Sequence, residues 1–154
     1  MAKLKILKKN APGLRCPCRP VTEITPRILT LLDDMKETMY DANGCGLAAP
    51  QVGVLRRVVV IDTGEGYMEL INPEIIAAEG EQCESEGCLS VPGEWGITRR
   101  PAKVTVRAQD REGNWYERTG EGLLARCFCH ELDHLDGKLF IDPGIMIERL
   151  EPDQ

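Results

Sequence analysis

The residues with the most informative chemistry and spacing are His130, Glu131 and His134, which form the pattern HExxH. On a helix, side chains at positions i and i+4 project from the same face, so both imidazoles can reach one metal ion. The glutamate that follows the first histidine then lies close to a metal-bound water. The pattern predicts a metal site on a helix, and its alternative is a helix whose histidines are only packed or solvated.

Two histidines do not complete such a site, because catalytic zinc-type centres use three protein ligands and keep one position open. The chain has no third histidine, and Phe140 occupies the position where the protease pattern HExxHxxGxxH needs one. Glu148 and Glu151 are downstream carboxylates, but few residues remain to build the helix that usually presents such a ligand. A cysteine is therefore the better candidate for the third ligand.

Two upstream segments, GCGLAAPQ at 44–51 and EGCLS at 86–90, complete a recognisable set. Together with HExxH they resemble, in order and separation, the three signature motifs of the peptide deformylases, GxGLAAxQ, EGCLS and HExxHxxG. The similarity continues through KLFID at 138–142. It implies metal-dependent hydrolysis of the formyl group from the N-terminal formyl-methionine of nascent polypeptides, with release of formate.

The resemblance also implies the ligands and the proton carrier. Cys88, His130 and His134 match the metal ligands of the family, and Glu131 matches its general acid and base. One thiolate and two neutral imidazoles leave a divalent ion positive enough to lower the pKa of bound water and to polarise a carbonyl. We expect one divalent ion, Fe(II) by the resemblance, although zinc, nickel and cobalt suit the same donors in purified protein.

The substrate contacts follow from the same comparison. Gln51 and the backbone N–H of Leu89 match the donors to the carbonyl oxygen of the substrate. The other residues expected to bind the substrate are Gly44, Gly46, Leu123 and Cys127. Arg126 and Glu84 depart from the family pattern, which often has apolar residues around the methionine side chain at these positions.

Two other functions compete with this interpretation. One is a zincin-type metallopeptidase, which the absence of a third histidine and the presence of Cys88 disfavour. The other is a non-catalytic protein that binds metal through thiols and imidazoles, which the presence of both Glu131 and Gln51 disfavours.

Composition and charge indicate the class of protein and the cellular compartment in which this chemistry would take place. The 154 residues are 42% hydrophobic and 29% charged. They contain no internal repeat, low-complexity tract or linker, so we expect one catalytic domain over residues 1–154. No apolar run approaches the about 20 residues of a membrane span, so we expect no membrane partner. The net charge of −6 argues against direct nucleic-acid binding. Seven cysteines without an export signal favour free thiols in a reducing cytoplasm.

The expected partner is an N-formyl-Met peptide, met in transient proximity to the ribosome. The chain ends soon after residue 150, so we do not expect the long basic C-terminal helix that some bacterial members of the family use there.

Local sequence patterns predict the helices and strands that position the site residues. Thr25-Pro26 predicts the start of an amphipathic helix that ends near Asn43. Strands are predicted at 55–62 and 67–73, which should pair, and a hairpin at 102–119. The segment 121–137 predicts a second helix that ends at Gly137, where a C-cap glycine belongs. One stripe of this helix is formed by Leu123, Leu124, Cys127, Glu131, His134 and Leu135. The fold class is α+β, with antiparallel sheets packed around a C-terminal helix carrying HExxH, plus one N-terminal helix.

Overall fold

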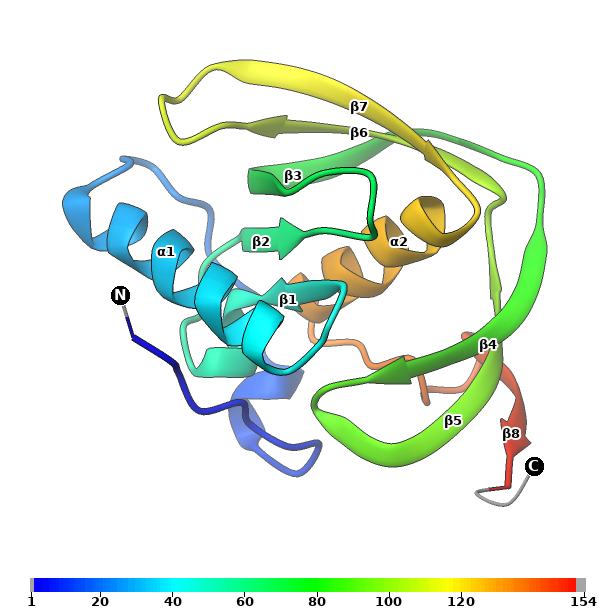
Figure 1. Ribbon diagram of the computed structural model, residues 1–154. Coiled ribbons are helices and arrows are strands. Elements are labelled where there is room, and N and C mark those ends of the chain that lie inside the picture. Colours follow the sequence, from blue (N-terminus) through cyan, green and yellow to red (C-terminus); the bar gives the residue numbers. More distant parts are fainter. Residues whose placement is uncertain (1, 152–154) are drawn as a thin grey trace.

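The computed structural model describes residues 2–151, and within them two antiparallel sheets enclose a central helix (Figure 1). One sheet has the strand order β1-β2-β3-β6-β7 and the other β4-β5-β8. The strands are β1 Gly46–Ala48, β2 Val58–Ile61, β3 Met68–Glu79, β4 Gln82–Cys88, β5 Val91–Arg100, β6 Lys103–Gln109, β7 Trp115–Glu121 and β8 Met146–Leu150. The helices are α1 Pro26–Asp41 and α2 Leu123–Leu135, with 3₁₀ turns η1 Pro12–Arg15 and η2 Ala49–Val52. The predicted α+β arrangement is confirmed.

The first helix begins and ends where the sequence predicts. Thr25 is the N-cap residue of α1, and its hydroxyl accepts a hydrogen bond of 3.3 Å from the backbone N–H of Ile28. Pro26 occupies the first helical position, where no N–H is needed. After the helix, Asn43 adopts a left-handed φ of 57°, which turns the chain toward β1.

Strand β2 is buried on both faces because a helix covers each side of the five-stranded sheet. Val58 and Val60 pack in the cluster with α1, whereas Val59 and Ile61 pack in the cluster with α2. This explains why β2 is a continuous apolar run rather than an alternating one. The predicted strand is confirmed but shorter, and its predicted pairing with β3 is also confirmed.

The hairpin predicted at 102–119 is confirmed as β6 and β7, and side chains along β6 alternate in burial. Val104 and Val106 are fully buried, while Lys103 is exposed and Thr105 is partly exposed. The inner face of this hairpin packs on α2.

Helix α2 differs from the predicted single stripe. Every residue from Leu124 to Leu132 is buried, because strands of both sheets contact this helix. Leu123 is the exception, since it lies at the first position of the helix and is 53% exposed. The chain turns after α2 at Gly137, whose φ is +77° and whose added Cβ would lie 2.6 Å from the Arg15 carbonyl oxygen. The end of α2 thus lies within two residues of the predicted boundary at 137.

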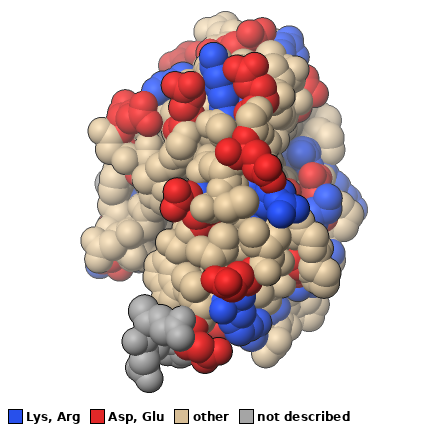
Figure 2. Space-filling view, turned by 90° about the vertical axis from the view of Figure 1, so that its right-hand side faces the viewer, with Lys and Arg blue, Asp and Glu red and all other residues tan. Residues whose placement is uncertain are grey.

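The three-stranded sheet was not predicted, because its strands lack a regular apolar alternation. Its small core consists of Val91, Leu139 and Phe140. Over the outer face of this part of the molecule, acidic and basic side chains are interspersed (Figure 2). Among the described residues, no helix is long and apolar enough to cross a membrane.

Candidate metal centre and active site

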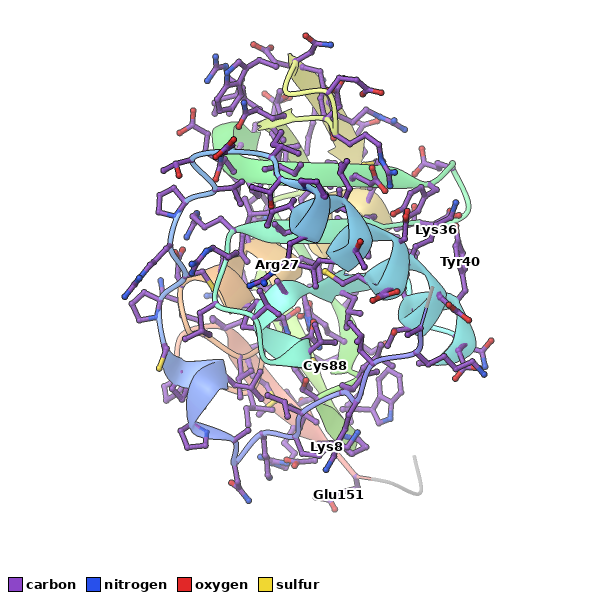
Figure 3. All side chains as sticks on the ribbon, turned by 90° about the vertical axis from the view of Figure 1, so that its left-hand side faces the viewer. Lys8, Arg27, Lys36, Tyr40, Cys88 and Glu151 are labelled. Atoms are coloured by element: carbon purple, nitrogen blue, oxygen red, sulfur yellow. The ribbon has the colours of Figure 1, made fainter. Side chains whose placement is uncertain are left out.

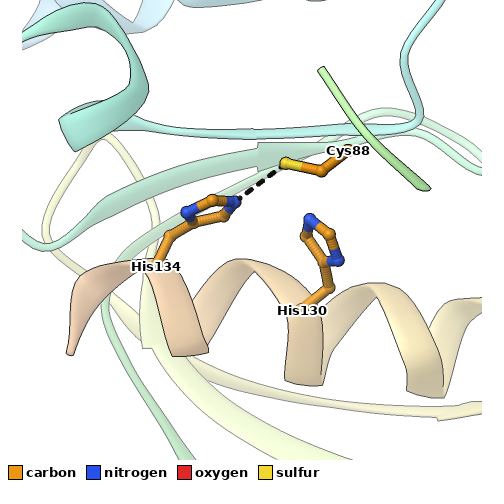
Figure 4. Close-up of side chains that lie close together, drawn as sticks. All are labelled: Cys88, His130 and His134. Atoms are coloured by element: carbon orange, nitrogen blue, oxygen red, sulfur yellow. Dashed lines mark hydrogen bonds between the residues drawn. The ribbon is translucent and has the colours of Figure 1, made fainter. Parts of the chain in front are cut away.

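Three donor atoms meet at the end of strand β4 and on one face of α2. The donors of Cys88, His130 and His134 lie within 4.8 Å of one another, and the Cys88 Sγ is 3.3 Å from His134 Nε2 (Figure 4). Seen from the side of α1, Cys88 lies toward the centre of the molecule, whereas Lys36 and Tyr40 lie at its rim (Figure 3). A thiolate and two imidazoles at this spacing are a suitable donor set for a divalent transition metal.

The ring of His130 is oriented by a carboxylate. Its Nδ1 is hydrogen-bonded to Glu86 Oε2, so Nε2 is the nitrogen left for a metal. Burial opposes the ionisation of Glu86, but hydrogen bonds with His130 and Arg100 hold the pKa of this carboxyl well below its usual range. Glu86 is therefore a permanent anion that fixes the histidine ring.

Arg100 ties this carboxylate back to the helix. Its Nη2 donates to Glu86 Oε2 over 2.7 Å, and its Nη1 donates to Asp133 Oδ2 over 2.6 Å. The guanidinium thereby connects β4 to α2 beside the metal ligands. Sequence reasoning missed both Glu86 and Arg100 as parts of the site. Glu86 could have been suspected as the first residue of EGCLS, but its partner lies 44 residues away.

Glu131, the predicted proton carrier, is buried next to His130 on α2. It is 3% exposed, and its Oε1 has no hydrogen-bond partner among residues 2–151. Burial raises the pKa of this carboxyl to about 7. A buried carboxyl oxygen without a partner is costly unless a ligand or a proton completes it. Among the described residues, Oε1 is thus a buried oxygen whose hydrogen bonding is incomplete.

A cavity of about 460 Å³ opens beside these groups. Nine of the ten candidate residues line it: Gly44, Gly46, Gln51, Cys88, Leu89, Leu123, Cys127, His130 and Glu131. His134 does not line the cavity, and it lies 1% exposed behind the other two ligands. Residues from three distant segments of the sequence therefore converge on one cavity.

The amide of Gln51 is held in a fixed orientation at this cavity. Its Oε1 accepts a 2.9 Å hydrogen bond from the backbone N–H of Ala48. Its Nε2 consequently points toward Ser90 Oγ at 3.1 Å and Cys88 Sγ at 3.7 Å. The donor end of the amide is presented next to the metal ligand, where the carbonyl of a substrate would lie.

A model of the polypeptide deformylase family matches residues 3–150. The chain belongs to this family. The peptide deformylase of Caldanaerobacter subterraneus is 61% identical over 145 residues, covering 94% of this chain and 91% of the relative. That of Agathobacter rectalis is 59% identical over 142 residues, covering 92% of this chain and 90% of the relative.

Solved structures agree with this assignment. The crystal structure of a peptide deformylase from Legionella pneumophila has a TM-score of 0.88 at 48% identity, covering 92% of this chain and 88% of its own. A peptide deformylase from Synechococcus elongatus, in complex with actinonin, has a TM-score of 0.88 at 40% identity, covering 92% and 79%. The chain is accordingly a peptide deformylase-type metallohydrolase that acts on formylated peptides.

Neither of the sequence positions considered in place of Cys88 supplies a third donor to this cluster. Glu148 is on β8, exposed and paired with Ile97 of the neighbouring strand. Phe140, at the position where some proteases have a third histidine, is buried and stacks on the ring of His130 with centroids 6.0 Å apart. Neither residue belongs to the donor cluster, whereas Cys88 does.

Arg126 lines the cavity, but its guanidinium is hydrogen-bonded to other residues of the protein. Its guanidinium donates to the Glu84 carbonyl oxygen at 3.1 Å, to Thr98 Oγ1 at 3.0 Å and to Gln82 Oε1. The side chain of Glu84 is exposed and does not line the cavity. Neither Arg126 nor Glu84, the two residues that depart from the family pattern, therefore presents a free charged group to the cavity.

We expect Gly46→Ala to lower the kcat of deformylation about 100-fold, the scale associated with misplacing a catalytic group by about 1 Å. A Cβ at position 46 would lie 2.5 Å from Glu131 Oε2, so the carboxyl must move. Steady-state kinetics on a formyl-Met peptide, together with a thermal unfolding curve, measures the effect.

Gly44→Ala is the matched comparison for this variant. Its added Cβ would meet the Leu89 Cδ1 atom at 2.7 Å, which is the end of a flexible side chain that can turn aside. The loss should be much smaller than for Gly46→Ala. Equal losses in the two variants would show that contact with Glu131 is not the reason why position 46 is a glycine.

Proposed function

We propose that this chain removes the formyl group from the N-terminal formyl-methionine of nascent polypeptides with Cys88, His130 and His134 as the ligands of a divalent metal. The observation that carries this proposal is the position of Glu131 in the same cavity wall as Cys88 and His130, buried and without a partner at Oε1 among the described residues. A protein that only stores a metal has no use for such a carboxyl, because an unpaired buried group costs stability.

Fe(II) is the metal we propose for the cell, on the family resemblance, with zinc, nickel or cobalt in purified protein. When bound, a divalent ion supplies Lewis acidity, which lowers the pKa of water and polarises a carbonyl. The thiolate of Cys88 and the carboxylate-oriented ring of His130 match an ion of this class.

Glu131 moves the proton in this mechanism. Its Oε1 accepts a proton from the attacking water and then delivers it to the amine that leaves when the formyl C–N bond breaks. A carboxyl whose pKa burial raises to about 7 can both accept and donate near neutral pH. The burial of Glu131 therefore suits both proton transfers, the one from water and the one to the leaving amine.

Gln51 and Leu89 stabilise the charge that develops on the formyl oxygen. The Gln51 Nε2 is already aimed at Cys88, and Leu89 follows Cys88 in the turn between β4 and β5. Such pre-oriented donors contribute about 3 kcal/mol each to transition-state stabilisation. Gly44, Gly46, Leu123 and Cys127 line the remaining wall, and we assign them to substrate binding.

The substrate we propose is an N-formyl-Met peptide in the cytoplasm, met near the ribosome without a lasting complex. The mixed surface charge of Figure 2 and the net charge of −6 do not favour a nucleic-acid partner.

Formate release from a formyl-Met peptide, measured beside cleavage of unblocked casein, tests the proposed function. A deformylase releases formate and leaves casein intact, whereas a zincin-type peptidase cleaves casein. A non-catalytic metal-binding protein does neither, so each outcome identifies one of the three functions.

We expect formyl-Met peptides to react about 100-fold faster or more than acetyl-Met peptides, the scale at which one methyl group can be discriminated by a closed site. Cys88, His130, Gln51 and Leu89 line the same cavity. In the proposed mechanism these residues surround the carbonyl carbon of the bound substrate, so an added methyl group would clash there in the transition state. The measurement is kcat/KM for the two peptides with the same sequence after methionine. Similar values would instead indicate a general aminoacylase.

A further inference from the structure

Two cysteines form a sulfur pair in the wall of the substrate cavity. Cys45, between the two glycines of the GCGLAAPQ segment, and Cys127, on α2, both line the cavity. Their Sγ atoms are 3.5 Å apart, and the Cys127 thiol also lies 3.6 Å from the Cys45 carbonyl oxygen. Cys45 is exposed and Cys127 is buried, so one sulfur faces the solvent of the cavity and the other lies behind it.

We propose that Cys45 and Cys127 form a reversible disulfide on exposure to a peroxide, and that this bond closes the substrate cavity. The proposal rests on the proposed function, because the cavity is the one we assign to the formylated peptide. It concerns two thiols that are neither metal ligands nor the proton carrier.

The geometry requires only a small movement. A disulfide has an S–S distance of about 2.05 Å, so the sulfurs must approach by about 1.5 Å from their present separation. The hydrogen bond from the Cys127 thiol lowers the pKa of Cys45, and this bond together with burial raises the pKa of Cys127. Cys45 is consequently the thiol that ionises and reacts first, and Cys127 is the resolving thiol.

The reaction balances in two steps. The Cys45 thiolate attacks one oxygen of hydrogen peroxide, an S–O bond forms, the O–O bond breaks and hydroxide leaves. Cys45 is now a sulfenic acid, and the peroxide has been reduced. The Cys127 sulfur then attacks the Cys45 sulfur, its proton leaves with the hydroxyl as water, and the S–S bond replaces the S–O bond. A dithiol reductant reverses the change by thiol exchange.

Forming this disulfide displaces the part of the cavity wall that contacts Glu131. Cys45 precedes Gly46, where the backbone is so close to Glu131 that even a Cβ would lie 2.5 Å from Oε2. Drawing Cys45 toward α2 shifts this backbone against Glu131 and places the S–S bond where substrate enters. We therefore expect the oxidised form to lose at least about nine-tenths of its activity, a scale that a sub-ångström displacement of catalytic groups readily produces.

The test uses the full chain loaded with nickel, whose valence is stable to mild peroxide, so that loss of activity does not arise from the metal. Wild type, Cys45→Ser and Cys83→Ser are compared, since Cys83 is an exposed cysteine on β4, away from the cavity. Each protein is measured before peroxide, after peroxide, and after dithiothreitol, relative to its own untreated activity. Mass spectrometry of the intact protein and of non-reduced peptides is recorded in parallel.

Wild type and Cys83→Ser should lose two hydrogen atoms, yield a peptide linked through Cys45 and Cys127, lose activity, and recover it with dithiothreitol. Cys45→Ser should show no linked peptide and keep its own activity. Equal inactivation of Cys45→Ser, or inactivation with oxygen on Cys88 and no linked peptide, would overturn the proposal. If the untreated protein releases no formate, the proposed function fails, while the linked peptide still decides whether the disulfide forms.

Discussion

Glu131→Gln lowers kcat by about 10²- to 10⁴-fold, the loss expected when a positioned acid and base is removed, while the fold and the bound metal are retained. The amide has nearly the shape of the carboxyl but cannot take a proton from water. Because Oε1 has no partner within residues 2–151, no structural hydrogen bond is lost in the exchange. Formate release, metal content and an unfolding curve on the same preparation measure the three quantities.

Glu84→Gln is the control for this variant, since it removes a carboxylate from an exposed position on β4, outside the cavity. We expect near wild-type turnover from it. Loss of the metal from Glu131→Gln would indicate that Glu131 is a metal ligand. Full turnover of this variant would show that Glu131 takes no part in the reaction.

Replacing any one of Cys88, His130 and His134 by alanine should reduce the metal content from one ion per chain to near zero and abolish formate release. Each residue would supply one of the three donors of the cluster found among residues 2–151, so a single replacement leaves two. Metal analysis after dialysis measures the loss, and circular dichroism shows that the fold persists.

Cobalt-substituted protein distinguishes the three ligands from one another. A thiolate on cobalt gives charge-transfer absorption, which should be present in wild type and in the control Cys83→Ala. It should be absent from Cys88→Ala even at high cobalt concentration. Survival of the band in that variant would remove Cys88 from the metal and favour a carboxylate as third ligand.

The elements that the sequence predicted are those whose signals are local. Thr25 and Pro26 specify the start of α1 through one hydroxyl and one missing N–H, and neither depends on distant residues. The hairpin of β6 and β7 follows from the alternation of Val104 and Val106 with polar neighbours and from the turn residues at 111–114. The HExxH spacing likewise places His130 and His134 on one face of α2 by helix geometry alone.

What the sequence did not predict depends on chain segments that meet only after folding. Strands β4, β5 and β8 carry no clear alternation, and the chain from 122 to 145 separates β8 from the other described strands. The single stripe predicted for α2 was too narrow, because both sheets pack on the helix and bury it on nearly every side.

The order of residues along the chain identifies the expected reacting groups: two imidazoles and a carboxyl at fixed helical spacing, and by resemblance a thiolate and an amide. Folding brought Cys88 to within 3.3 Å of His134 and set Glu86 against Nδ1 of His130. It also placed the Cys45 sulfur against that of Cys127, 82 residues away along the chain. The physical reason is that periodicity encodes only neighbours within a turn or a strand, whereas distances between segments are set by how the sheets and helices bury their apolar faces together.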